Sequence, residues 1–198
     1  SYPPGIPAVI GDLPGRSIGE LLVESCRKFS DRPAFTCMDK SLTYAEVEKK
    51  SADFGGFLQS RGLKRGARVA IMMPNVLQYP VAMMGVLRAG YTVVNVNPLY
   101  TPRELEHQLN DSGAEAIVIL ENFAATLQAV VARTKVRHVV VAAMRDLLGL
   151  KGLLVNLVVR RVKNPMMISA WGYIEATLAV KAAETLEAQE AMALNRAF

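Results

Sequence analysis

Residues 68–110 read RVAIMMPNVLQYPVAMMGVLRAGYTVVNVNPLYTPRELEHQLN, and this stretch decides the fold. Residues 68–73 are rich in Val, Ile and Met, which predicts a buried strand. Residues 76–89 run on to Gly90 without a break and predict a helix, and the β-branched residues 91–96 predict a second strand. Strand, helix and strand in this order form a βαβ unit, which requires parallel strands and a right-handed crossover.

Three further helix starts are marked by capping boxes, in which Glu follows a Ser or Thr by three residues. We therefore expect helices to begin after Ser17, Thr43 and Thr101. Gly62 and Gly113 are expected to end the second and third of these helices, because glycine adopts the left-handed conformation that closes a helix.

Shorter elements complete the pattern. Asp39-Lys40 predicts a tight hairpin turn between two of them. The other predicted elements are strands at residues 34–38, 41–43, 116–120 and 138–142 and a helix at residues 122–133. This alternation of strands and helices indicates an α/β fold, a layered, mostly parallel sheet flanked by helices.

The composition favours a folded protein in a reducing compartment. Hydrophobic residues make up 51% of the 198 residues, which is enough for a sizeable core and argues against disorder. The two cysteines, Cys26 and Cys37, match no CxxC or metal-ligand spacing, so we interpret them as small buried hydrophobes. The net charge is +5. Basic residues do not alternate with aromatic ones on one face, so we expect no nucleic-acid partner.

The chain divides into three regions by composition. Residues 1–16 predict an extended N-terminal arm, residues 17–144 an α/β subdomain, and residues 145–198 a helical extension that begins basic and ends Ala/Glu-rich. No basic region followed by an apolar core marks a secretory signal, and no apolar run reaches about 18 residues, the minimum for a membrane-spanning helix. We therefore expect a cytoplasmic location.

Several motifs resemble the adenylate-forming, or AMP-binding, superfamily. One is LTYAEV at residues 42–47, and another is LRAG at residues 87–90 running into residues 93–98. The sequence NPLYTPRELEHQLNDSG at residues 97–113 resembles, more specifically, the long-chain fatty-acid–CoA ligase branch of this superfamily. The resemblance covers residues 17–163 and implies the N-terminal subdomain of such an enzyme.

The resemblance implies a two-step reaction. Fatty acid and Mg-ATP give an acyl-adenylate and pyrophosphate, and the CoA thiol then attacks the acyl carbonyl. The sequence contains no Walker-type or dinucleotide-type glycine loop, and the family's Ser/Thr/Gly loop ending in Pro-Lys-Gly is also absent. We therefore assign no catalytic, cofactor-binding or metal-binding residue, and expect this N-terminal part of a ligase to be inactive alone.

The best local candidate for a site follows the second strand of the βαβ unit. Open parallel sheets bind ligands at the carboxyl ends of their strands. The resemblance implies that this edge borders the acyl tunnel or a subdomain interface, and the candidate residues are Asn97, Pro98, Leu99 and Tyr100. Weaker candidates, each explained equally well by helix surface, strand start or core packing, are His107 beside Glu106, His138, Tyr79 and Tyr91.

Residues 145–163 predict a cationic helix with a broad apolar face, which suits an anionic membrane surface. Its candidate membrane-facing residues are Lys151, Arg160, Arg161 and Lys163. Such docking would make the protein peripheral on the inner membrane. Burial of this helix against the sheet is the alternative.

Two other functions stay open: a stand-alone, non-catalytic acyl- or membrane-binding module, and another acyl- or aryl-CoA ligase of the superfamily. Half of an α/β fold should also expose an apolar edge, so we expect self-association.

Overall fold

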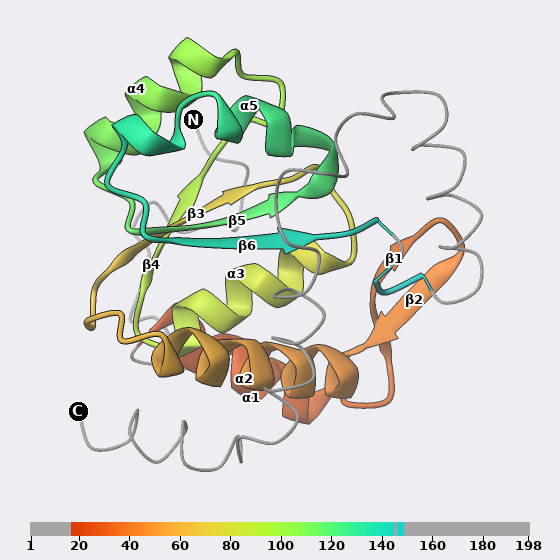
Figure 1. The fold of residues 1–198 in the computed structure, drawn as a ribbon. Helices are drawn as coiled ribbons and strands as arrows, with labels where there is room; N and C mark the ends of the chain where they lie inside the picture. Colours follow the sequence, from red (N-terminus) through yellow and green to blue (C-terminus); the bar gives the residue numbers. More distant parts are fainter. Residues whose placement is uncertain (1–16, 145, 149–198) are drawn as a thin grey trace, which may run out of the picture.

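The computed structural model describes residues 17–144 and 146–148 (Figure 1). Its elements, in chain order, are α1 Ile18–Lys28, β1 Pro33–Cys37, β2 Lys40–Thr43, α2 Tyr44–Ser60, β3 Arg68–Met72, α3 Gln78–Arg88, β4 Thr92–Asn95, α4 Pro102–Ser112, β5 Ala116–Leu120, the 3₁₀ helix η1 Glu121–Phe123, α5 Ala124–Gln128, the 3₁₀ helix η2 Val131–Arg133, and β6 His138–Ala142.

The main sheet contains four strands in the order β4-β3-β5-β6. All three pairings are parallel, with Val69 of β3 opposite both Val93 of β4 and Ala116 of β5. The chain therefore steps from β3 to β4 on one side and then returns past β3 to β5 and β6. Helices α1, α2 and α3 lie on one face of the sheet, and α4 and α5 lie on the other (Figure 1). The predicted α/β fold with a parallel sheet is confirmed.

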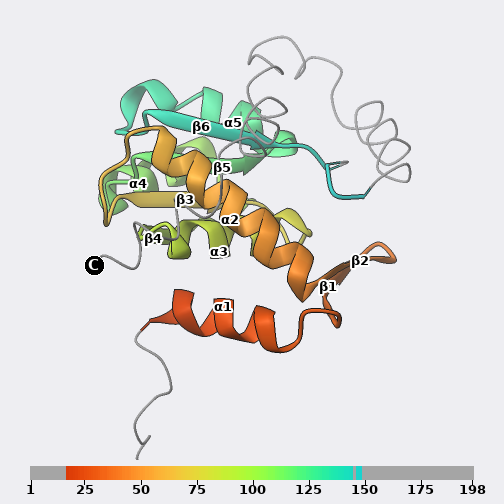
Figure 2. The same ribbon diagram turned by 90° about the horizontal axis from the view of Figure 1, so that it is seen from below.

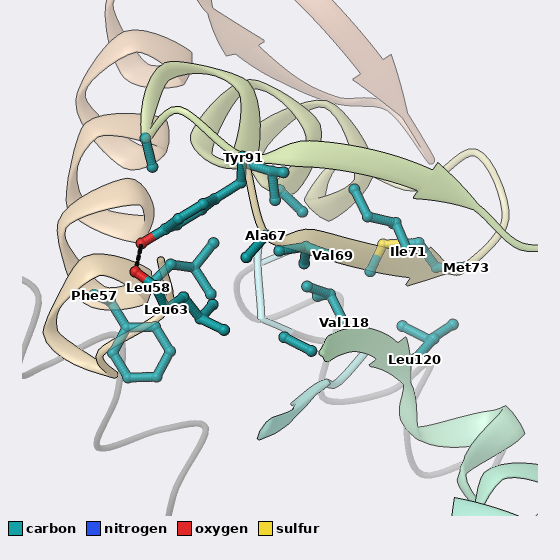
Figure 3. Packing of buried hydrophobic residues seen from close by; sticks show 14 of the residues in the cluster. Phe57, Leu58, Leu63, Ala67, Val69, Ile71, Met73, Tyr91, Val118 and Leu120 are labelled. Atoms are coloured by element: carbon teal, nitrogen blue, oxygen red, sulfur yellow. Dashed lines mark hydrogen bonds between the residues drawn. The ribbon is translucent and has the colours of Figure 1, made fainter. Parts of the chain in front are cut away.

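The central strands β3 and β5 are buried on both faces, so their side chains alternate between two cores. Val69, Ile71 and Val118 pack against α2 and α3, as Figure 3 shows for part of this cluster. Ala70 and Ile117 pack on the opposite face, against α4 and α5, in a cluster that we call the second core. Burying a Val, Leu or Ile side chain stabilises a fold by about 1.5–3 kcal/mol, so these two layers hold the sheet between its helices.

Local helix signals are confirmed where they were predicted. The Thr43 and Thr101 side chains each accept a hydrogen bond from the amide three residues on, and the Glu at that position bonds back to the cap amide. The Ser17 hydroxyl accepts from Glu20 N at 3.1 Å. Gly62 and Gly113 follow their helices with φ of +73° and +64°, a conformation that suits glycine.

Helices α2 and α3 pack closely, and a buried cation lies between them. Arg88 is 8% exposed, and its Nη1 donates to Glu48 O at 2.8 Å and to Ser51 Oγ at 2.9 Å. Burial lowers the pKa of Arg88, and these acceptors offset part of the cost of burying its charge. Glycines at the crossing, Gly55 and Gly85, allow the helix backbones to approach.

A third cluster is formed by side chains of α1, the β1–β2 hairpin, α2 and α3. Figure 2 labels these elements. Cys26 and Leu42 are buried in it, and Cys37 is half-buried against it. Both cysteines are free thiols, and burial raises the pKa of Cys26, which keeps it protonated. Cys26 therefore packs as a small apolar residue.

The hairpin turn lies one residue earlier than predicted. Its central residues are Met38 and Asp39, with φ of +50° and +59°, and Cys37 pairs with Lys40. The predicted turn at Asp39-Lys40 is therefore wrong. The observed register places Thr36 opposite Ser41, whose hydroxyl oxygens lie 2.7 Å apart.

Two helices are shorter than predicted. Helix α3 begins at Gln78 rather than at residue 76, which places Pro80 in the first turn, where its missing N–H is tolerated. The predicted helix over residues 122–133 is wrong as one element, because α5 spans only Ala124–Gln128 between two 3₁₀ turns. Val130 leaves the helical region, with φ of −131°, and buries its β-branched side chain in the second core.

The predicted arm and nearly all of the predicted extension lie outside the described residues. From the extension, Leu147 and Leu148 contact the third cluster. The boundary at residue 144 stays a prediction. Within residues 17–144 and 146–148, no helix is both long and apolar enough to cross a bilayer.

Candidate functional site

The four parallel strands end at one edge of the sheet, which we call the carboxyl edge (Figure 1). The chain reverses its direction of progress across the sheet between β3 and β5, because β4 follows on one side of β3 and β5 on the other. In open parallel sheets such a switch point is where ligands usually bind. The carboxyl edge is therefore the candidate ligand-binding edge of the sheet.

Amide and hydroxyl side chains brace this edge. Tyr79 Oη donates to Asn95 Oδ1 at 2.8 Å, and Gln108 Nε2 donates to the Asn95 carbonyl at 2.8 Å. Gln78, in the first turn of α3, donates through Nε2 to the Ala143 carbonyl at 2.8 Å. These bonds tie the end of β4 to α3 and α4, and the end of β6 to α3.

Two buried acceptors on the same edge lack a donor among the residues that the structure describes. They are Oε1 of Gln108 and Oδ1 of Asn122, the second residue after β5. A buried acceptor left unsatisfied costs about 1–3 kcal/mol. The edge is therefore suited to a partner that brings hydrogen-bond donors. Neither amide is among the residues predicted from the sequence, although an Asn two residues beyond the carboxyl end of a strand is a readable signal.

The predicted segment 97–100 lies on this edge, just beyond the outer strand β4. Asn97 Oδ1 accepts from Leu99 N at 3.0 Å, and Tyr100 N donates to the Asn97 carbonyl at 3.2 Å. This turn leaves Leu99 83% exposed, while Pro98 is half-buried and Tyr100 packs against the second core. The structure thus brings this segment next to Asn95 and Gln108.

The tyrosine and histidine candidates are not brought together at this edge. Tyr91 is buried, and its hydroxyl donates to the Leu63 carbonyl at 3.1 Å near the opposite ends of the strands (Figure 3). Burial raises the pKa of Tyr91, as expected for a core residue. His107 is exposed on α4, and His138 begins β6 at the opposite edge. Of the candidates outside segment 97–100, only Tyr79 lies at the carboxyl edge.

Glu106, the acidic neighbour of His107, is engaged in an ion pair. Its two carboxylate oxygens accept from Arg133 Nε at 2.9 Å and from Arg133 Nη2 at 2.7 Å. This pairing lowers the pKa of Glu106 and raises that of Arg133. The pair links α4 to η2, so acid–base work with His107 has no support.

The residues at the carboxyl edge do not fit nucleotide phosphates or a divalent metal. The loops that follow β3, β4 and β5 contain no glycine and no basic residue, whereas phosphate sites rely on glycine-rich backbone and cations. Among residues 17–144 and 146–148, no group of three His, Cys, Asp or Glu side chains is placed to hold a metal ion. We derive no step that uses ATP or Mg²⁺ from these residues.

The predicted membrane-facing residues lie outside the described part of the chain, so their role stays a prediction. They are Lys151, Arg160, Arg161 and Lys163.

Curated proteins similar to this chain include long-chain-fatty-acid–CoA ligases. The long-chain-fatty-acid–CoA ligase of Salmonella typhimurium is 53% identical over 165 residues, which cover 82% of this chain and 29% of the relative. The enzyme of that name from Haemophilus influenzae is 50% identical over 166 residues, covering 83% and 30%. The chain thus spans less than a third of the length of these curated relatives.

Solved structures share the fold. A long-chain-fatty-acid–CoA ligase from Archaeoglobus fulgidus superposes with a TM-score of 0.59 at 24% identity, over 65% of this chain and 28% of that one. A benzoate CoA ligase from Burkholderia xenovorans gives 0.61 at 23% identity, over 64% and 26%. The family described as AMP-binding enzyme matches residues 22–187, and the chain therefore belongs to the AMP-binding enzyme family.

Proposed function

We propose that this chain forms the N-terminal α/β part of a long-chain fatty-acid–CoA ligase. The ligase joins a long-chain fatty acid to CoA through an acyl-adenylate, with ATP and Mg²⁺ as cofactors. The observation that carries the proposal is the 53% identity over 165 residues to a ligase of that name. Within this enzyme the described residues supply the sheet and its carboxyl edge. Contacts to ATP and Mg²⁺ come from polypeptide outside them.

A chimera tests this proposal directly. The aligned residues of the Salmonella typhimurium ligase are replaced by those of this chain, and formation of long-chain acyl-CoA is measured. We expect activity within about tenfold of the parent, because at this identity most core contacts are volume-conserving exchanges. A chimera that folds, as judged by its melting transition, but makes no acyl-CoA would contradict the proposal.

The 198-residue chain alone should catalyse no pyrophosphate exchange with ATP and a long-chain fatty acid. The carboxyl-edge loops lack the glycines and cations that hold phosphates, so nothing described there stabilises the charge that develops during adenylation. Exchange well above blank, from material of confirmed mass, would contradict this prediction.

Leu99 gives a sharper test of the carboxyl edge. We propose that segment 97–100 lies against the acyl tunnel or a neighbouring subdomain in the complete enzyme, where Leu99 becomes buried. Burying a leucine contributes about 1.5–3 kcal/mol, so Leu99→Asp in the active chimera should lower kcat/KM for a long-chain fatty acid by at least about tenfold. The measurement is the initial rate against fatty-acid concentration.

The matched control is Ile18→Asp, because Ile18 is also exposed and apolar but lies at the start of α1. This control should leave kcat/KM nearly unchanged. Neither variant should shift the melting transition of the 198-residue chain by much, since both side chains are exposed in it. Equal losses of activity in the two variants would argue against a special role for segment 97–100.

Self-association is also part of the proposal. Phe35 and Met38 on the hairpin and Leu21 on α1 are large apolar residues with exposed side chains. Apolar surface of this kind favours pairing of two copies. Sedimentation over a concentration series checks this, and a monomer at every concentration would exclude it.

A further inference from the structure

The amino ends of the four strands form the opposite edge of the sheet, which we call the amino edge. A hollow of about 550 Å³ opens there, beside the first residues of β3 and the loops that lead into β5 and β6. Its lining includes Arg68, Lys135, Arg137 and a single carboxylate, Glu115. This edge lies opposite the proposed substrate-facing edge, so the inference does not depend on the proposed ligase activity.

The walls of the hollow are fixed by the backbone. Glu115 N donates to the Arg68 carbonyl at 2.9 Å, and Arg137 N donates to the Glu115 carbonyl at 2.8 Å. Thr134 closes the adjoining turn, because its hydroxyl donates to Val131 O at 2.8 Å and accepts from Val136 N at 3.3 Å. The three basic residues are therefore presented from a rigid frame.

The charges in the hollow do not balance. Glu115 pairs with Arg137, which neutralises one of the three cations. In the described part of the chain, no carboxylate pairs with Arg68 or Lys135. Lys64 is exposed on the loop just before β3 and adds a further positive charge near this edge. The carboxyl end of α4 lies beside Arg68 at Gly113 and offsets its charge in part.

We propose that the amino-edge hollow binds a phosphate-bearing anion. Arg68 supplies a planar fork of donors that matches phosphate oxygens, and Lys135 supplies a second, mobile charge. The hollow is open to solvent rather than enclosed, and its volume is large enough for a phosphate and the group attached to it. The phosphate belongs either to a free ligand or to a phospholipid headgroup.

The experiment has two arms that separate these sources. In the first, the ¹⁵N-labelled 198-residue chain is titrated with pyrophosphate, and the amide signals of Gly113, Glu115 and Val136 are followed. In the second, the chain is floated with phosphatidylcholine vesicles that contain or lack phosphatidylglycerol. Saturable shifts confined to this edge support the proposal with a free phosphate as the source. Flotation supports it with a headgroup as the source only if it requires phosphatidylglycerol and is weakened by substitution of Arg68 or Lys135, because residues 145–163 are themselves predicted to favour anionic vesicles.

Charge variants make the test specific. Arg68→Gln and Lys135→Gln should each weaken binding by about fivefold, the effect expected for one basic residue near an anionic surface. The matched control is Arg103→Gln, because Arg103 is also exposed but lies in the first turn of α4, on the carboxyl-edge side. Melting transitions verify that all three variants fold. Absence of binding in both arms, or an equal loss in the Arg103 variant, would overturn the proposal.

Discussion

Leu105→Ala is expected to lower the free energy of unfolding by about 2–5 kcal/mol, which is a large part of the 5–15 kcal/mol typical of a domain. Leu105 lies on α4 with 0% of its surface exposed, and it packs in the second core with Leu109 and Ile117. Truncation leaves a cavity between α4 and the sheet, because the neighbouring strands are held by their ladder and cannot collapse into it. Urea unfolding followed by circular dichroism measures the change.

Leu99→Ala is the matched control, since the same side chain is removed six positions earlier in the chain. Leu99 is 83% exposed, so its truncation should change the free energy of unfolding by no more than about 0.5 kcal/mol. A similar loss in both variants would mean that α4 does not pack against the sheet as described. The difference in stability loss expected between Leu105→Ala and Leu99→Ala comes only from the burial of Leu105.

Gly85→Val should lower the free energy of unfolding by about 3 kcal/mol. The cause is overpacking, whereas Leu105→Ala leaves a cavity. A Cβ at this position would lie 2.7 Å from Phe54 Cδ1 and 3.0 Å from the Ser51 carbonyl oxygen. Valine therefore forces α2 away from α3 and disturbs the bond between Arg88 and Ser51 at 2.9 Å. The same urea experiment reports the loss.

Gly19→Val is the control for this substitution. Gly19 is also helical, but a Cβ there would meet its nearest neighbour, Arg88 Cα, at an ordinary 3.6 Å. Valine also has a somewhat better helix propensity than glycine, so this variant should lose much less stability than Gly85→Val. If Gly85→Val proved as harmless as Gly19→Val, the close approach of α2 and α3 would be refuted.

Elements with strong local signals were predictable from the sequence. Strands β5 and β6 coincide with the predicted residues 116–120 and 138–142, because each is a short run rich in β-branched residues that begins directly after a charged residue. The capping boxes at Thr43 and Thr101 also lie where they were predicted, since a cap depends on residues three positions apart.

Features that depend on distant residues were not predictable. The sequence of residues 122–133 carries no signal that the Val130 side chain packs in the second core. Its Ala-rich composition favours a longer helix instead. Asn95 accepts hydrogen bonds from Tyr79 on α3 and from Gln108 on α4, and only the folded sheet brings these residues together. Segment 97–100 was placed correctly at a strand end, but its exposed leucine follows from a turn that the sequence did not reveal.

The strand order has a consequence for synthesis of the protein on the ribosome. Strand β4 emerges before β5, although β5 pairs with the other side of β3. Until residues 116–120 leave the ribosome, β3 has one unpaired edge, which is a template for pairing with another chain. At about 5–20 residues per second, the nascent chain carries this exposed edge for a time on the order of seconds. Helix α4 emerges within this interval, so the face that it covers is shielded before the sheet is complete.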